Sequence, residues 1–209
     1  MTTNAGLDRP HVFLPREEPA GGPPLLLLHG TGGNEHDLLP LRGRLSPGAA
    51  VLSVRGTVLE NGMPRFFRRL QEGVFDEDDL HQQADDLAEF VVAASAAYGI
   101  DQGALVAVGF SNGANIASAL LLQRPGLLRA AVLLAAMVPF AEPPPADLTG
   151  TLVVVSNGEQ DGMIPSATTS RLLEQLRERS AEVVELSHPG GHRIDPDRLP
   201  QIRDLIARR

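Results

Sequence analysis

A serine between two glycines stands near the middle of the chain, in Gly109-Phe110-Ser111-Asn112-Gly113. The apolar run before it, 104–108, is typical of a buried strand, and the Ala/Leu-rich run after it, 114–123, is typical of a helix. Strand, Gly-x-Ser-x-Gly and helix together indicate a nucleophile elbow, a sharp turn that exposes the serine hydroxyl above a sheet. The helix start behind Ser111 would favour a developing negative charge. Alone, the five residues also fit a tight turn whose serine caps the helix.

A serine hydroxyl needs a base to take its proton, and the base needs a group that orients it. Loops after the last two predicted strands offer two acids, Asp161 and Glu159, and two histidines, His192 and His188. We favour His192, because two glycines before it let its loop turn back over the sheet and a helix behind it fixes its position. We favour Asp161, because it lies deeper in its loop, although an Asp ahead of a helix is also a common turn residue. The order Ser, acid, His is typical of a serine enzyme on such a sheet.

Acyl transfer also needs hydrogen-bond donors for the oxyanion. The amide of Asn112, directly after the serine, is one candidate. The amide of Thr31 is the second, because the glycines of Gly30-Thr31-Gly32-Gly33 let that loop point an amide inward. A phosphate cradle is the competing interpretation, but the loop has neither a Gly-Lys-Ser/Thr ending nor the spacing of a dinucleotide loop.

The remaining histidines are predicted to have no part in the chemistry. His29 ends a strand, where we expect it to form a hydrogen bond beneath the glycine-rich loop. His11, His36 and His81 are expected on the solvent-facing surface, the usual place for a lone polar residue.

Strands and helices alternate along the chain, which predicts an α/β fold with a mainly parallel sheet and helices on both faces. The ligand site in such a sheet lies beyond the carboxyl ends of the strands, so the loops named above should meet at one edge. The segment 57–75 is expected to be irregular, with a turn at Asn61-Gly62. The connection 139–150 is too short for a helical cap, so we expect no cap domain and a fairly open site. The predicted strands are 11–14 (an edge strand), 25–28, 50–54, 104–108, 129–136, 151–156 and 183–186; the predicted helices are one capped by Asn34 that ends before Pro47, then 78–98, 114–123, 166–179 and 197–209.

Length and composition set outer limits on the function. The 209 residues fit a single domain over 1–209, and 43% hydrophobic residues are enough for a sizeable core. A net charge of −8 argues against nucleic acid as a partner. The chain has no cysteine, no basic start followed by an apolar core, and no apolar run long enough for a bilayer, so we expect a cytoplasmic protein without membrane contact. Neither a metal nor a cofactor is expected, and a homodimer is compatible with the sequence.

Four segments resemble the phospholipase/carboxylesterase family of α/β-hydrolases, and the resemblance covers the chain from about residue 10 to its end. It implies that Ser111, Asp161 and His192 are the catalytic triad and that the amides of Thr31 and Asn112 form the oxyanion hole. The segments are Leu28-His29-Gly30-Thr31-Gly32-Gly33, Gly109-Phe110-Ser111-Asn112-Gly113-Ala114-Asn115, Asp161-Gly162-Met163-Ile164-Pro165 and Gly191-His192.

Two further segments, Val54-Arg55-Gly56 and Arg65-Phe66-Phe67, resemble a small bacterial branch of this family that includes hydrolases linked to hydroquinone or catechol stress. In the acyl-protein thioesterase branch, Gln usually follows the nucleophile and Leu stands in the oxyanion loop. Asn112 and Thr31 occupy those places here, so a lipid or protein thioester is not carried over as the substrate.

The sequence therefore predicts a serine carboxylesterase that acts on small-molecule esters with short acyl chains or small aryl groups. A ring-opening, carbon–carbon or lactone hydrolase of aromatic breakdown, a thioesterase, and a non-catalytic binding protein on the same fold are the alternatives. Arg55 and Arg65 could bind an acidic group of the substrate, although salt bridges to the acidic stretch 76–79 are the favoured interpretation. The remaining predicted pocket residues are Met63, Phe66, Phe67, Met163 and Ile164.

Overall fold

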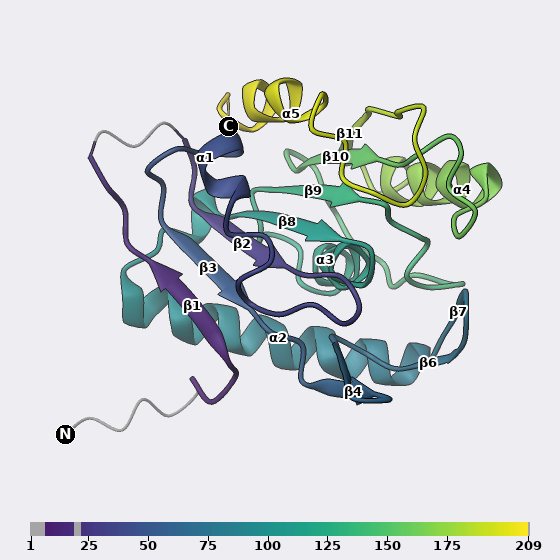
Figure 1. The fold of residues 1–209 in the computed structure, drawn as a ribbon, viewed down its shortest axis with the longest axis horizontal. Coiled ribbons are helices and arrows are strands. Elements are labelled where there is room, and N and C mark those ends of the chain that lie inside the picture. Colours follow the sequence, from purple (N-terminus) through teal and green to yellow (C-terminus); the bar gives the residue numbers. More distant parts are fainter. Residues whose placement is uncertain (1–6, 19–21, 209) are drawn as a thin grey trace.

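Seven strands form one sheet in the order β1-β3-β2-β8-β9-β10-β11 (Figure 1). All neighbouring strands are parallel except β1, which lies antiparallel to β3. The predicted place of β1 at the edge of the sheet is confirmed. The computed structural model describes residues 7–18 and 22–208; most of the N-terminal start and the last residue of the predicted closing helix lie outside these residues. The sheet strands are β1 (His11–Leu14), β2 (Leu25–Leu28), β3 (Val51–Val54), β8 (Val106–Phe110), β9 (Ala130–Leu134), β10 (Leu152–Ser156) and β11 (Glu182–Glu185).

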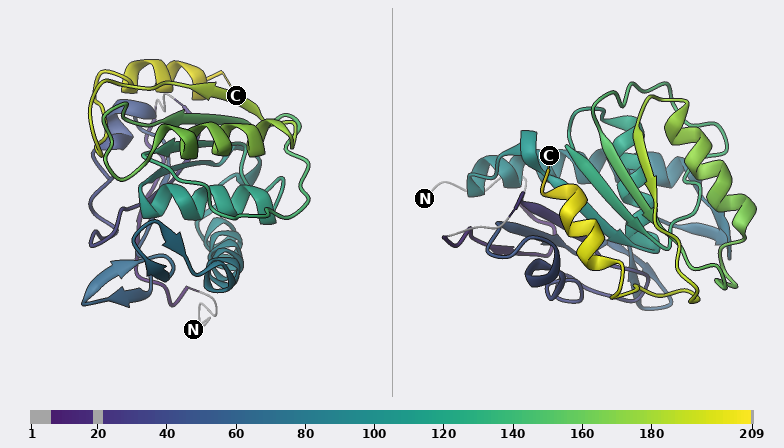
Figure 2. Two further views of the ribbon diagram at one scale, coloured as in Figure 1. Left: turned by 90° about the vertical axis from the view of Figure 1, so that its right-hand side faces the viewer. Right: turned by 90° about the horizontal axis from the view of Figure 1, so that it is seen from above.

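Helices cover both faces of the sheet, as Figure 2 shows from the side. Helices α2, α3 and α4 pack on one face and α1 and α5 on the other, each with its own cluster of buried apolar side chains. Because both faces are covered, the central strands are continuous apolar runs, and all four leucines of β2 are buried. The helices are α1 (Leu41–Leu45), α2 (Glu77–Tyr98), α3 (Asn112–Gln123), α4 (Ser166–Arg177) and α5 (Leu199–Ile206), with a short 3₁₀ helix η1 (Gln102–Ala104).

The strand order reverses between β2 and β8, and this reversal positions the site. The chain runs outward from β2 to β3 and later returns to place β8 on the other side of β2. Leu28 and Gly109 are direct neighbours in the β2–β8 ladder. The loops that follow these two strands therefore open side by side, at the kind of switch point where α/β sheets bind ligands.

The first helix is shorter than predicted. Asn34 does not cap a helix: its side chain accepts a hydrogen bond from the His36 amide in a turn, and the Asn34 amide bonds to Asp37 Oδ2. Helix α1 begins only after Pro40. A proline within a helix lacks the amide that would bond one turn back, so the helix begins behind it. The closing helix α5 is likewise shorter than the predicted 197–209.

The segment 57–75 was expected to be irregular, and this prediction is wrong. It forms two hairpins, β4 (Val58–Glu60) with β5 (Met63–Arg65), and β6 (Arg69–Gln71) with β7 (Val74–Phe75). The predicted turn is confirmed: Asn61 and Gly62 both have positive φ, 51° and 79°, as a tight hairpin turn requires. Within the part of the chain that the structure describes, no helix separates β9 from β10, and no helix is both long and apolar enough to cross a bilayer.

Candidate active site

Ser111 occupies a strained turn between β8 and α3. Its backbone angles are φ 52° and ψ −115°, a region that side chains rarely adopt. The Ser111 amide donates to the Leu134 carbonyl at 2.8 Å, which fixes the turn to the neighbouring strand β9. A side chain at Gly113 would collide with the Leu28 carbonyl, and one at Gly109 would collide with the Gly113 carbonyl. The close approach of these backbones therefore explains both glycines of the motif.

The structure brings Ser111, His192 and Asp161 into one chain of hydrogen bonds. His192 Nε2 lies 2.9 Å from Ser111 Oγ, and His192 Nδ1 lies 2.8 Å from Asp161 Oδ2. With its proton on Nδ1, the imidazole donates to the carboxylate and accepts from the serine hydroxyl. The second oxygen of Asp161 accepts from the amides of Met163 at 2.8 Å and Ile164 at 3.2 Å. The carboxylate is thus held by its own loop while it faces the histidine.

The loops that carry the acid and the histidine pair with each other beyond the sheet. They follow the parallel neighbours β10 and β11, and their backbones stay joined by a bridge between Gly158 and His188. The amides of Glu159 and Gln160 donate to the carbonyls of His188 and Gly190 at 2.8 and 3.0 Å. This pairing explains how residues 31 positions apart in the sequence reach hydrogen-bond distance.

Glu159 and His188, the alternative acid and base, do not form part of this chain of hydrogen bonds. Glu159 accepts a hydrogen bond from Ser187 Oγ at 3.2 Å in an exposed position. His188 is fully buried, and its Nδ1 accepts from the Gly190 amide at 3.2 Å. Neither has a recorded contact with Ser111 among the described residues, whereas Asp161 and His192 form the relay.

His29 has the predicted structural position. Its Nδ1 donates to the Gly30 carbonyl at 2.6 Å, and its Nε2 accepts from the Gly56 amide at 3.0 Å. Burial lowers the pKa of the His29 imidazole, so the ring stays neutral beneath the glycine-rich loop.

Two surface histidines were predicted wrongly, and one correctly. His36 is exposed, as expected. His11 is half-buried, with Nε2 2.6 Å from the Tyr98 hydroxyl. His81 stacks on Phe140 and contacts Gln123 Oε1 at 2.8 Å. Their aromatic neighbours come from distant segments that a lone histidine does not reveal.

The two residues predicted to supply the oxyanion amides line the same cavity as Ser111. Asn112 begins α3, where the first amides have no acceptor within the helix. Thr31 lies in the loop after β2, and the described residues provide no acceptor for its amide. The neighbouring Gly32 amide donates to the Pro64 carbonyl at 2.9 Å, so the hairpin β4–β5 braces this loop. Neither amide thus has an acceptor among the described residues.

A cavity of about 50 Å³ opens at Ser111, between the glycine-rich loop, the two hairpins and the loop after β10. By a minimum of about 10–15 Å³ per water, it holds only roughly three to five water molecules. A wider hollow of about 410 Å³ shares Gly73, Phe75 and Met137 with it and extends along the start of α4. The cavity is lined by Thr31, Arg65, Arg69, Glu72, Gly73, Phe75, Ser111, Asn112, Asn115, Ala135, Met137, Met163, Ile164 and His192.

Three of the predicted pocket residues, Arg65, Met163 and Ile164, line this cavity, and the others do not. Phe66 and Phe67, which lie between the two hairpins, are fully buried and belong to the core cluster on one face of the sheet. Met63 is 41% exposed and lies over Gly32. Met63 therefore packs near the glycine-rich loop and does not line the cavity.

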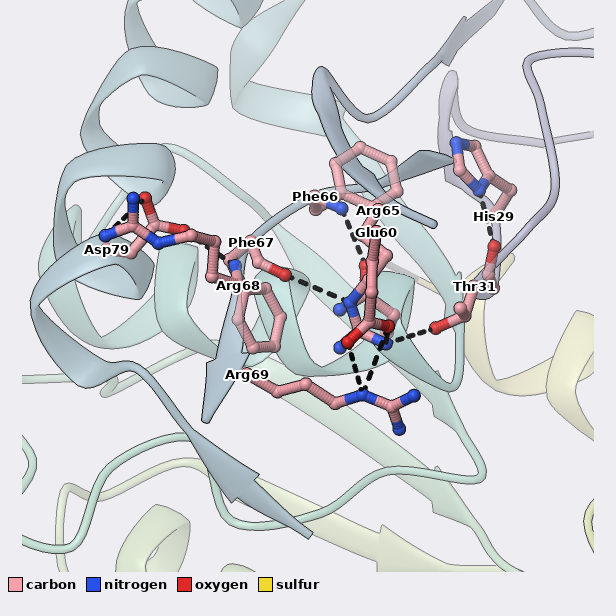
Figure 3. A network of polar contacts seen from close by, with 11 residues as sticks. His29, Thr31, Glu60, Arg65, Phe66, Phe67, Arg68, Arg69 and Asp79 are labelled. Carbon is pink, nitrogen blue, oxygen red and sulfur yellow. Dashed lines mark hydrogen bonds and ion pairs between the residues drawn. The ribbon is translucent and has the colours of Figure 1, made fainter. Parts of the chain in front are cut away.

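The expected partners of the two arginines were also wrong. Arg55 binds both carboxylate oxygens of Glu35, and this bond lowers the pKa of Glu35. Arg65 contacts Glu60 and Thr31 (Figure 3). Instead, Arg68 pairs with the 76–79 stretch, through Asp76. An arginine can form a salt bridge with any nearby carboxylate, so the sequence alone does not determine which acidic residue is its partner.

Several cavity residues were missed. Arg69, Glu72 and Phe75 belong to the second hairpin, which has no clear periodicity in the sequence. Ala135 was included in a predicted strand, but it follows the end of β9 with a φ of 54° and lines the cavity. The rule that ligands lie beyond strand ends, applied to the predicted strand 129–136, would have found the neighbouring cavity residue Met137 but not Ala135.

A mainly parallel sheet wrapped by helices, with a serine at a nucleophile elbow on its central strand, defines an α/β-hydrolase. A family model described as Phospholipase/Carboxylesterase matches residues 51–208. The chain therefore belongs to the phospholipase/carboxylesterase family, which confirms the resemblance seen in its motifs.

Individual relatives support the same conclusion. The protein MhqD of Bacillus subtilis (strain 168), which carries the name of a hydrolase, is 43% identical over 180 residues, 86% of this chain and 90% of that protein. The crystal structure of a Bacillus cereus carboxylesterase superposes with a TM-score of 0.92 at 43% identity, over 96% of this chain and 94% of that one. A carboxylesterase from Mesorhizobium loti has a TM-score of 0.84 at 30% identity, over 88% of both chains. The chain is thus a hydrolase with carboxylesterases among its relatives.

Proposed function

We propose that the protein is a serine carboxylesterase for esters with short acyl chains or small aryl groups. The observation that carries this proposal is the hydrogen-bonded relay from Asp161 Oδ2 through the His192 ring to Ser111 Oγ, with links of 2.8 and 2.9 Å. Acyl transfer requires a base at hydrogen-bond distance from the serine hydroxyl, and a buried carboxylate that orients this base.

The proposed reaction has two halves. His192 Nε2 takes the hydroxyl proton while Ser111 Oγ bonds to the ester carbonyl carbon, and the carbonyl oxygen becomes an oxyanion facing the amides of Thr31 and Asn112. The carbon–oxygen bond to the alcohol then breaks, and His192 gives its proton to the leaving alkoxide. Water repeats the sequence on the acyl-enzyme, with His192 again as base, and releases the acid. Asp161 keeps the imidazole in the required tautomer throughout.

The size of the cavity supports short substrates. About 50 Å³ at Ser111 leaves room for a small group, and the described chain has no helical cap between β9 and β10 that could shelter a long acyl chain. The wider hollow that begins at Gly73, Phe75 and Met137 can hold a bulkier second group of the ester, such as an aryl alcohol. Chain-length series with a fixed alcohol are therefore expected to favour short acyl groups, and a preference for long ones would contradict this part.

The alternative of a lactone or carbon–carbon hydrolase would use the same relay. One observation favours keeping it: Arg65 lines the cavity, and ring-cleavage products of aromatic compounds carry acidic groups. It differs from the first proposal in expecting that neutral aryl esters are poor substrates and that Arg65 is essential even for the cleavage step.

The decisive experiment is labelling with a fluorophosphonate probe, which reacts with an activated serine. Wild-type protein should be labelled and Ser111→Ala should not. Wild-type protein that has not met the probe should hydrolyse members of an ester panel. Ser118→Ala is the matched control, because Ser118 is a fully buried serine of α3 whose hydroxyl has no partner among the described residues. Labelling that persists in Ser111→Ala would remove Ser111 as nucleophile.

A further inference from the structure

The cavity beside Ser111 has a buried cation in its wall. Arg65, the last residue of β5, lines the cavity, and only 4% of its side chain is exposed. Burial lowers the pKa of this guanidinium. An arginine nevertheless stays protonated in proteins, so the charge persists and needs compensation.

That compensation is incomplete within the described chain. Arg65 Nε donates to the Phe67 carbonyl at 3.1 Å, and Nη1 donates to Thr31 Oγ1 at 2.8 Å, both neutral acceptors. Its carboxylate contact, Nη1 to Glu60 Oε2, is long at 3.5 Å. For Nη2 no acceptor is recorded among the described residues, and this atom is not among those fully sealed from solvent. The Nη2 group therefore remains available to a ligand.

Glu60 is committed mainly to another arginine. Arg69 Nε donates to both of its oxygens, at 2.9 and 3.1 Å, and this hydrogen bond is the main cause of the lowered pKa of Glu60 (Figure 3). Arg69 also lines the cavity. Two guanidinium groups thus share one carboxylate. Glu60 itself does not line the cavity. The acidic residue in the described cavity wall is Glu72, which is exposed at the tip of the second hairpin, where water screens its charge.

The backbone around Arg65 holds the guanidinium in place. Arg65 pairs with Val58 in the β4–β5 ladder, and its carbonyl lies so close to Gly56 that a side chain there would collide with it. The adjacent Pro64 carbonyl accepts the Gly32 amide at 2.9 Å. Since Arg65 also binds the Thr31 hydroxyl, the cation is fixed beside the loop that supplies an oxyanion amide.

We propose that Arg65 binds a carboxylate carried by the substrate, so that the enzyme prefers acidic esters over neutral esters of the same shape. This inference rests on the proposed esterase function and names the substrate class of that same site. The free Nη2 group of a charged guanidinium can donate to a carboxylate oxygen, and charge-assisted hydrogen bonds of this kind are stronger than neutral ones. The chain's net charge of −8 does not attract anionic substrates, so their selection would depend on a local cation such as Arg65.

The test compares two pairs of esters that match in shape and differ in charge. Monomethyl succinate and methyl isocaproate differ on the acyl side, and acetoxyacetate and isobutyl acetate differ on the alcohol side. The readout is the ratio of kcat/KM for the acidic ester to that for its neutral partner, in wild type and in Arg65→Gln. We expect Arg65→Gln to lower this ratio on the order of 10- to 100-fold for at least one pair. Arg65→Lys, which keeps the charge but loses the fork, should fall between them.

The matched control is Arg68→Gln. Arg68 belongs to the same segment, but its side chain is 61% exposed, pairs with Asp76 and does not line the cavity. This variant should leave both ratios unchanged. If Arg65 served only to hold Thr31, the acidic and neutral esters would lose activity together and both ratios would stay at the wild-type value, which overturns the proposal. Fluorophosphonate labelling of wild type and Arg65→Gln separates that result from failure of the esterase function itself, in which no labelling occurs.

Discussion

The amide of Phe66 donates a hydrogen bond of 2.7 Å to Asn112 Oδ1, across 46 positions of sequence. Asn112 directly follows Ser111 and begins α3, whereas Phe66 directly follows Arg65, the last residue of the β4–β5 hairpin. Both residues are buried. This single bond therefore joins the nucleophile turn to the wall of the cavity, and it gives the side chain of Asn112 a part that is independent of its backbone amide.

Replacement of Asn112 by alanine should lower both stability and activity. The oxyanion amide would remain, but the buried Phe66 amide would lose its acceptor, which typically costs about 1–3 kcal/mol. We expect a loss of that size in the free energy of unfolding measured with urea, and a lower kcat/KM. Ser118→Ala in the same helix removes a hydroxyl without a partner among the described residues and should cost less. Equal stability of Asn112→Ala and wild type would show that the bond carries little energy.

Asp161→Asn should remove most activity while the fold persists. The new side-chain oxygen can still accept from the amides of Met163 and Ile164, as Asp161 Oδ1 does. Its amide group would then face His192 Nδ1 and favour the wrong tautomer, a change that lowers kcat by about 10⁴ in a serine protease triad. We expect a loss of roughly 10³–10⁴ in kcat with an unchanged circular dichroism spectrum. A loss below tenfold would argue that Asp161 does not orient His192.

The parts of the site that follow sequence-local rules could be predicted. Ser111 directly follows β8, and Asp161 and His192 lie in the loops after β10 and β11. Parallel strands deliver such loops to one edge of the sheet. The two glycines around Ser111 mark the turn by themselves. The conformation of the chain at these positions depends on neighbours in the sequence, so the sequence reveals it.

The cavity wall could not be predicted in the same way. The hairpins within 57–75 have strands of two or three residues, too short for an alternating pattern, and their charged residues look like a solvated loop. Whether Arg55 pairs with Glu35 or with the 76–79 stretch depends on the distance between separate segments. The same holds for the half-buried His11, whose neighbour Tyr98 is 87 positions away. Tertiary contacts decide these cases, and no local signal encodes them.

The strained backbone at Ser111 should lower the stability of the fold while it positions the hydroxyl needed for activity. With φ at 52° and ψ at −115°, any side chain is disfavoured, whereas glycine adopts this region freely. Ser111→Gly should therefore be more stable than Ser111→Ala by about 1 kcal/mol in urea unfolding, although both are inactive. The control pair at Ser118, inside α3, should show the opposite order, because glycine weakens a helix by about 0.5–1 kcal/mol relative to alanine. The same order at both positions would mean that the turn is not strained.

The buried neutral His29 should make the protein less stable in mild acid. Burial lowers its pKa in the folded state, so the unfolded chain, with a pKa near 6.5, takes up the proton first. Stability is then lost as the pH falls through about 6.5 and is regained as the pH rises. A histidine whose pKa is raised by an acidic partner has the opposite pH dependence of stability. Urea unfolding between about pH 7.5 and pH 5.5 should show this decline in wild type and a smaller one in His29→Asn, which cannot be protonated there. His36→Asn, a change at an exposed ring, is the control and should keep the wild-type slope. Equal slopes in wild type and His29→Asn would exclude His29 as the cause, because the proton taken up by the unfolded chain would then belong to another group.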